Sequence, residues 1–276
     1  MSGSPENLTG TGLEVLDVQA DPDFAKRHLH DHDIAAQMSA MQRLASAFVE
    51  TPETLLQELV NAAVDLCGAD SAGISLQATD ESGETSYTWV ATAGKYAHFL
   101  NAKLPSFPSA CAVCIERGQP QIFRVSRTFF DLMKVDADIV TDGLLIPWEV
   151  DGTYGTVWVM AHGRFEAFDT TDCRMMQTLA NFAAMAVRQQ RQQKLLLEQA
   201  TATAAAAMAN ELAHEINNPL QSLTNSVYIA SENLSGSDAQ ALARDMSIDL
   251  ERLSTLTKKI LALPIDKIRR SATGRD

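Results

Sequence analysis

The residues best suited to chemistry are a neighbouring histidine and glutamate, His214 and Glu215, in the stretch "LAHEINNPL". A neutral imidazole is a good nucleophile near pH 7 and needs no metal ion to act as one. An adjacent carboxylate can polarise the imidazole or take its proton during an attack. Asn218 follows about one helical turn later, where its amide can orient a water molecule. These residue types at this spacing predict a nucleophilic site, provided that the imidazole is exposed.

The helix that carries His214 has an apolar stripe on its opposite side. The apolar residues recur every three or four positions, at Leu212, Ile216, Leu220, Leu223, Val227 and Leu234. At about 100° per residue, His214 lies roughly 200° from Leu212 and on the same side as Asn218. Pro219 removes a backbone donor, so the sequence predicts a bend just after the histidine. We therefore expect an exposed, reactive histidine. The alternative is that His214 is only a solvated polar side chain that takes part in no reaction.

Two helical runs joined by the turn-like Ser235–Asp238 predict an antiparallel helical hairpin at residues 208–264. The apolar residues of the second run are spaced by 3.5 positions on average, the period of a left-handed supercoil. They are Leu242, Met246, Leu250, Leu253, Leu256, Ile260 and Leu263. A hairpin cannot bury such a stripe alone, so we expect a homodimer in which two copies form a four-helix bundle.

The segment before the hairpin predicts one long helix. No proline or glycine occurs from Arg188 to Ile216, and Ala, Leu, Gln and Glu dominate the composition. A helix this long and polar needs a partner, so we expect a parallel coiled coil at residues 191–207. Such a helix would carry a rotation, tilt or register change towards His214.

Residues 34–190 predict a separate α+β domain. A helix begins near Ile34, and Thr51-Pro52-Glu53 is a typical start for another. Strands are predicted for "SAGISLQATD" and "TSYTWVATAG", and a hairpin with Asp151-Gly152 at its turn for "GLLIPWEVDGTYGTVWVMAH". Asp169 is the expected cap of the closing helix. Residues 1–33 read as a loosely ordered leader and residues 265–276 as a tail.

The pattern over residues 35–190 resembles the GAF family of small-molecule sensing modules. The resemblance depends on "LLIPWEVDGTYGTVWVMAH…FDTTDCRMMQTLANFAAMAV", which matches the final hairpin and closing helix of that family. It implies a GAF-like antiparallel sheet with flanking helices and a small-molecule ligand. The resemblance leaves the ligand and any cofactor unknown, because such domains carry many functions on one scaffold.

The stretch "LAHEINNPL" resembles the H-box of the dimerisation and phosphoacceptor domain (HisKA type) of two-component sensor histidine kinases. The resemblance implies that His214 is the phosphoacceptor and Glu215 its adjacent acid. It also implies that Asn218 holds water in the phosphatase reaction and that Pro219 marks the bend. The implied partner is a response regulator, whose aspartate receives the phosphoryl group.

Such kinases continue into an ATP-binding domain of more than about 100 residues, which this sequence lacks. After Leu263 only "PIDKIRRSATGRD" follows, and no Asp-x-Gly-x-Gly motif occurs there. We expect no self-phosphorylation, so ATP would act only through a partner in trans or through a missing domain. The chain is expected to be either a fragment of a longer kinase or a naturally short protein that is phosphorylated in trans.

The four cysteines predict no disulfide framework. Cys111 and Cys114 could be core thiols, a redox pair, half of a metal site or a chromophore attachment point, but no second pair at zinc-site spacing follows. We therefore predict no metal, with these two cysteines as the weak candidates.

Composition excludes several classes of protein. The net charge of −13 argues against nucleic-acid binding, and no run of about 18 apolar residues is present. With no export signal, a cytoplasmic protein is expected.

The functional hypothesis is a phosphorelay sensor in which a small-molecule or redox signal gates His214. The alternatives are a sensing dimerisation module with an unreactive histidine, or an adaptor that heterodimerises with full kinases.

Overall fold

The computed structural model describes residues 8–29, 34–230 and 236–261. The chain divides into two compact units, Met1–Gln192 and Gln193–Asp276. One helix, α5 (Thr170–Ala230), contributes to both units. We call the first unit the sheet domain and the second the hairpin unit. Within the described ranges, no helix combines the length and the apolar character needed to cross a membrane.

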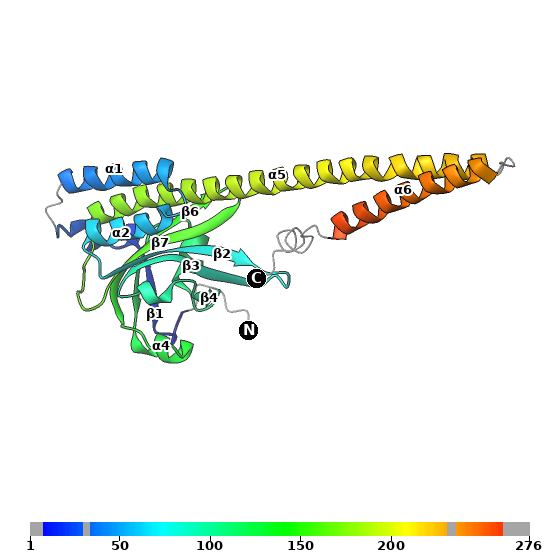
Figure 1. The fold of residues 1–276 in the computed structure, drawn as a ribbon. Helices are drawn as coiled ribbons and strands as arrows, with labels where there is room; N and C mark the ends of the chain where they lie inside the picture. Colours follow the sequence, from blue (N-terminus) through cyan, green and yellow to red (C-terminus); the bar gives the residue numbers. More distant parts are fainter. Residues whose placement is uncertain (1–7, 30–33, 231–235, 262–276) are drawn as a thin grey trace. The chain divides into compact units, whose positions relative to one another are not determined.

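The sheet domain contains one sheet of seven antiparallel strands in the spatial order β1-β5-β6-β7-β2-β3-β4 (Figure 1). The strands are β1 (Leu13–Asp17), β2 (Ser71–Thr79), β3 (Thr85–Gly94), β4 (Lys103–Pro105), β5 (Gln121–Val125), β6 (Val140–Val150) and β7 (Thr153–Ala161). β6 and β7 are joined at Asp151-Gly152, where both φ angles are positive, 49° and 70°. Two consecutive residues of this kind make a tight hairpin turn, so the predicted hairpin is confirmed.

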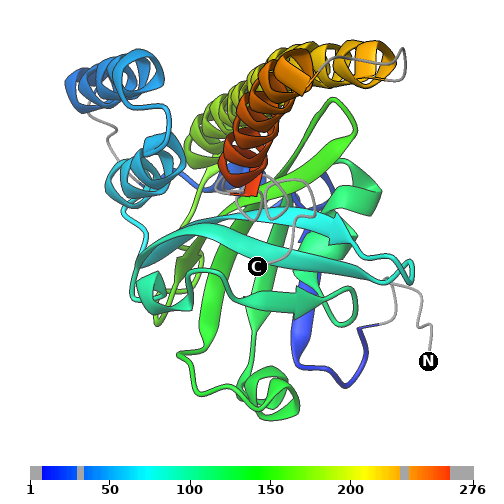
Figure 2. The same ribbon diagram turned by 45° about the vertical axis from the view of Figure 1, so that its right-hand side comes forward.

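Helices cover both faces of this sheet. They are α1 (Ile34–Glu50), α2 (Leu55–Cys67), α3 (Ala110–Arg117), α4 (Arg127–Met133) and the start of α5, with short 3-10 turns η1 (Val18–Ala20), η2 (Phe24–Lys26) and η3 (Ala97–Phe99). Side chains alternate along a strand, so neighbours enter different cores. Leu144 and Val157 join the core with α2 and α5, whereas Leu145 and Trp158 join the core with α3 and α4. In Figure 2 the first part of α5 lies along one face of the sheet.

The closing helix begins as predicted. Asp169 accepts hydrogen bonds through Oδ1 from the backbone N–H groups of Thr171, at 2.7 Å, and Asp172, at 3.1 Å. These bonds satisfy donors that have no partner inside the helix.

Two predictions about the N-terminal half are wrong. The leader is ordered over residues 8–29, because β1 pairs with β5 from Leu13↔Val125 to Asp17↔Gln121. Residues 1–7 and 30–33 lie outside the described part. The second helix starts at Leu55 and not at Thr51, because Thr51 accepts a turn hydrogen bond from the Thr54 N–H and the intervening residues form a turn. The proline therefore precedes the helix.

The hairpin unit consists of the end of α5 and α6 (Gly236–Leu261), which runs back along α5 (Figure 1). α5 continues without interruption through Pro219. The least exposed positions of α5 in this unit follow a spacing of four and three, and they are Leu212, Ile216, Pro219, Leu223 and Ser226. The matching positions of α6 are Leu242, Met246, Asp249, Leu253 and Leu256. This alternation is typical of two helices packed along a seam.

The predicted apolar stripe is therefore only partly the seam. Pro219 and Ser226 take the buried positions of the seam, whereas Leu220 and Val227 of the predicted stripe are 46% and 56% exposed in the single chain. Leu234, Leu263 and the residues of the predicted tail lie outside the described residues.

Candidate functional sites

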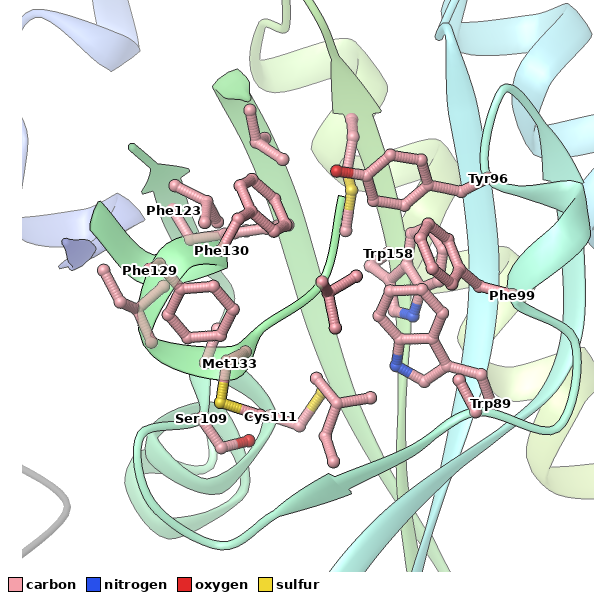
Figure 3. A pocket seen from close by; sticks show the side chains of 18 of the residues that line it. Trp89, Tyr96, Phe99, Ser109, Cys111, Phe123, Phe129, Phe130, Met133 and Trp158 are labelled. Carbon is pink, nitrogen blue, oxygen red and sulfur yellow. The ribbon is translucent and has the colours of Figure 1, made fainter. Parts of the chain in front are cut away.

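The sheet domain holds an apolar pocket between the sheet and the segment that carries α3 and α4. Its volume is about 130 Å³. Aromatic and sulfur-containing side chains form most of the wall, and those labelled in Figure 3 include Trp89, Tyr96, Phe99, Cys111, Phe123, Phe129, Phe130, Met133 and Trp158. An apolar cavity of about 150 Å³ accommodates a benzene molecule. The pocket therefore has room for a ligand of about one ring.

Two glycines on the sheet allow aromatic rings to lie close to the backbone. A Cβ atom at Gly73 on β2 would lie 2.1 Å from the Trp158 ring, and one at Gly143 on β6 would lie 2.5 Å from the Phe123 ring. Any larger residue would push these rings into the pocket. The glycines thus preserve both the flat aromatic wall and the space in front of it.

The aromatic wall is a packed cluster. The rings of Trp89 and Trp158 are 4.6 Å apart between centroids, and Tyr96 and Phe99 meet edge to face at 5.1 Å. Rings in such contacts hold their orientation, so this side of the pocket is pre-formed.

Most polar groups around the pocket already have partners within the protein. The indole Nε1–H of Trp158 donates to Ser75 Oγ at 3.1 Å. The Cys111 thiol donates to the same oxygen at 3.5 Å and accepts a hydrogen bond from Thr156 Oγ1 at 3.4 Å. Ser109 Oγ accepts from the N–H of Ala112. Trp89 differs: its Nε1–H is buried and has no acceptor among the described residues.

The segment from α4 to the start of β6 covers one side of the pocket, and two hydrogen bonds fix its end. The Tyr96 hydroxyl donates to the Asp138 carbonyl at 2.5 Å. The His162 ring contacts the Ile139 carbonyl through Nδ1 at 2.9 Å and Ser71 Oγ through Nε2 at 2.8 Å. A carbonyl can only accept, so Nδ1 carries a proton and donates to Ile139, and Nε2 shares a hydrogen bond with the serine hydroxyl. His162 is therefore a structural link and not a free base.

The two candidate cysteines do not form a common site. Cys111 faces Ser75 and Thr156, whereas the Cys114 thiol points to the carbonyls of Gln119 and Leu145, both at 3.5 Å. Burial raises the pKa of both thiols, so they stay protonated and weakly nucleophilic near neutral pH. Among the described residues, no group of three or more His, Cys, Asp or Glu side chains could hold a metal ion.

His214, Glu215 and Asn218 lie together on the hairpin unit. All three side chains are exposed on α5, and His214 lies on the side away from the seam with α6. The predicted exposure of His214 is therefore confirmed. Asn218 follows four residues later on the same side, and Pro219 beside it is buried in the seam. The geometry leaves the imidazole open to another protein.

Sequence reasoning did not find the pocket. Its wall comes from strands and from residues 96–140, which showed no helix or strand period. The available signal was the aromatic residues Trp89 and Trp158, each on a strand whose neighbours enter the opposite core.

Comparisons with known proteins concern the sheet domain. Residues 49–188 match the profile of a family described as the GAF domain. A comparison with curated proteins found no match.

Several solved structures resemble the fold. The GAF domain from a phosphoenolpyruvate-protein phosphotransferase of Coxiella burnetii shares 17% identity, and the alignment covers 58% of this chain and 95% of that one with a TM-score of 0.47. The corresponding Acinetobacter domain shares 16%, with 55% and 93% covered and a TM-score of 0.44. Residues 122 to 287 of a methyl-accepting chemotaxis protein share 18%, with 54% and 95% covered and a TM-score of 0.41.

Proposed function

Because the chain belongs to the GAF domain family of signal-sensing modules, we propose that its sheet domain binds a small molecule in the apolar pocket and thereby controls phosphoryl transfer through His214. The observation that carries this proposal is the continuity of α5. Met176, Leu179 and Ala183 of this helix are buried in the core of the sheet domain, and His214 stands on the same helix. A change in how the sheet domain packs on α5 can therefore pass along one continuous helix.

The exposed imidazole supports phosphoryl transfer at the output end. His214 attacks the γ-phosphorus of ATP held by a kinase domain and displaces ADP, while Glu215 assists by accepting or polarising the ring proton. The phosphoryl group then passes from the imidazole to an aspartate of a response regulator. When the signal favours dephosphorylation, Asn218 orients a water molecule that hydrolyses the acyl phosphate of the regulator. In this proposal ATP acts through a kinase domain in trans or through a further domain.

A second copy of this chain is the partner that fits the hairpin unit. Leu220 and Val227 on α5, and Leu250 on α6, remain exposed beside the seam. Each lies about 60–80° from the seam in the same rotational sense, which on antiparallel helices places all three on one side of the hairpin. A two-fold copy covers this side and gives a four-helix bundle that leaves His214 accessible.

Phosphoryl exchange with response regulators tests the output. Response regulators from the same cell are phosphorylated with radioactively labelled acetyl phosphate and purified. Each is then mixed with the chain, and the label is followed on both proteins. We expect acid-labile label on the wild-type chain or accelerated loss of label from one regulator. His214→Ala abolishes the exchange, whereas Asn225→Ala, a substitution on the same exposed side of α5, leaves it unchanged.

Two outcomes would overturn the phosphorelay proposal. If the wild type neither accepts nor removes label, and His214→Ala behaves identically, the hairpin is a dimerisation module with an unreactive histidine. If the chain instead forms a heterodimer of defined mass with a full histidine kinase, it acts as an adaptor.

A further inference from the structure

We propose that the pocket of the sheet domain selects an uncharged, single-ring molecule that carries a hydrogen-bond acceptor, with the indole N–H of Trp89 as the donor. The inference depends on the proposed sensory role of this pocket and names the class of ligand. It assigns to Trp89 the directional contact in an otherwise apolar site.

The first observation is the unpaired indole of Trp89. Its side chain is 8% exposed, and its Nε1–H has no acceptor among the described residues. The neighbouring Trp158 has its N–H satisfied by Ser75. A buried donor without a partner is unfavourable and uncommon, so an acceptor supplied by a ligand would be strongly preferred over a ligand without one. In Figure 3 the nitrogen edge of Trp89 faces across the pocket towards Cys111 and Met133.

The second observation is that other polar groups at the wall are occupied. Cys111 is bonded to Ser75 and Thr156, the Tyr96 hydroxyl to the Asp138 carbonyl, and Ser109 to a backbone N–H. These groups have no strong remaining requirement for a ligand. A single unsatisfied donor matches a ligand with a single acceptor, such as a carbonyl or ether oxygen.

Size and charge narrow the class further. A pocket of about 130 Å³ is too small for a nucleotide or a tetrapyrrole, but it suits one ring. Lys103 is the cation at the pocket rim; it is exposed, and its ammonium group can stay in water while its alkyl stem contacts the wall. A carboxylate placed in the apolar interior would lose its hydration without a buried counter-charge. The ligand is therefore expected to be neutral.

A matched set of probes tests the proposal on the full chain. Acetophenone has a carbonyl acceptor, ethylbenzene has nearly the same shape without one, and benzoate adds a charge. Affinities are measured for the wild type, for Trp89→Phe and for the control Trp148→Phe. Trp148 also has a buried, unpaired indole N–H, but it belongs to the core on the opposite face of the sheet.

We expect the wild type to prefer acetophenone over ethylbenzene by about tenfold, which corresponds to one net hydrogen bond of about 1.4 kcal/mol. Trp89→Phe abolishes this preference, and Trp148→Phe keeps it. Because a larger cavity in Trp89→Phe affects both probes, the ratio of the two affinities isolates the hydrogen bond.

Nuclear magnetic resonance provides a direct readout. The sequence contains three tryptophans, so the protein gives three indole N–H signals. The signal missing in Trp89→Phe identifies Trp89, and acetophenone should move it downfield much further than ethylbenzene does.

The remaining outcomes separate this inference from the proposed function. Binding of both neutral probes with equal affinity, unchanged in ratio by Trp89→Phe, overturns the role of Trp89 but leaves a sensory pocket. If benzoate binds more tightly than the neutral probes, and Lys103→Met removes this binding, the expectation of a neutral ligand is overturned. If no probe binds at millimolar concentration, the sensory role of the pocket fails as well.

Discussion

The two candidate sites of this chain are built in opposite ways. The pocket gathers side chains from β1, β3, β4, β5, β6, β7, α3 and α4, and most of them are buried and fixed by packing. The proposed histidine site consists of three residues within five positions of α5, and all three are exposed. The pocket therefore depends on the stability of the sheet domain, whereas the chemistry that we propose for His214 would depend on local helix geometry and on its partners. Substitutions that disrupt the structure of one site should leave the structure of the other intact.

Arg27→Met should show the largest difference between its effects on the two sites, because it targets only the sheet domain. The Arg27 guanidinium donates to Asp142 Oδ2 and to the Phe168 carbonyl, both at 3.2 Å, and both charged side chains are buried. Removal of the cation leaves a buried carboxylate, which costs about 3–5 kcal/mol near pH 7. Urea unfolding followed by tryptophan fluorescence measures this loss, because all three tryptophans lie in the sheet domain.

The pH dependence of Arg27→Met follows from the same pair. Burial raises the pKa of Asp142, and Arg27 counteracts this effect. Without Arg27 the native carboxyl binds its proton more tightly, while the unfolded chain releases it near pH 4. The native state then holds more protons, so its stability falls as pH rises from 4 towards 7.

The loss in free energy of unfolding caused by Arg27→Met should therefore be smaller at pH 5 than at pH 7. Arg124→Met is the matched control, because Arg124 pairs with Glu14 of β1 at the surface, where the loss should stay below about 1 kcal/mol. Equal losses for the two variants would contradict the proposed role of the buried pair.

This contrast explains what the sequence could predict. The turn at Asp151-Gly152, the cap at Asp169 and the exposure of His214 depend on residues within a few positions of one another, and each is confirmed. Arg27 was assigned to a loose leader because its partner, Asp142, is 115 positions away. No local pattern signals such a pair.

The division of the predicted stripe into two rows has a related cause. Heptad spacing fixes which residues lie near one side of a helix, but it does not say which of two adjacent apolar rows meets which neighbour. In α5 the row through Pro219 and Ser226 faces α6, and the row through Leu220 and Val227 is left for another partner. Only the packed hairpin distinguishes the two rows.

A second prediction concerns that exposed row and should affect only the hairpin unit. Leu250→Glu places a charge on the side that we propose a second copy covers, so it should raise the dissociation constant of the homodimer at least about tenfold, or about 1.4 kcal/mol. Ile248→Glu is the matched control: Ile248 is 54% exposed and Leu250 56%, but Ile248 points away from that side. Sedimentation over a range of concentrations measures both, and an equal effect of the two substitutions would place the dimer contact elsewhere.

The smallest effect is expected for Tyr96→Phe, which loosens the cover of the pocket without changing its shape. The variant loses the hydrogen bond from the Tyr96 hydroxyl to the Asp138 carbonyl, at a cost of about 1 kcal/mol. The ring contacts with Phe99 and His162 remain. Hydrogen exchange should therefore rise about fivefold in residues 134–139 and hardly at all in β7 or α5, because the opening is local. Tyr154→Phe, on the exposed surface of β7, serves as the control. Faster exchange throughout the sheet domain would mean that this hydroxyl supports the whole fold, and the pocket would then have no cover that opens independently.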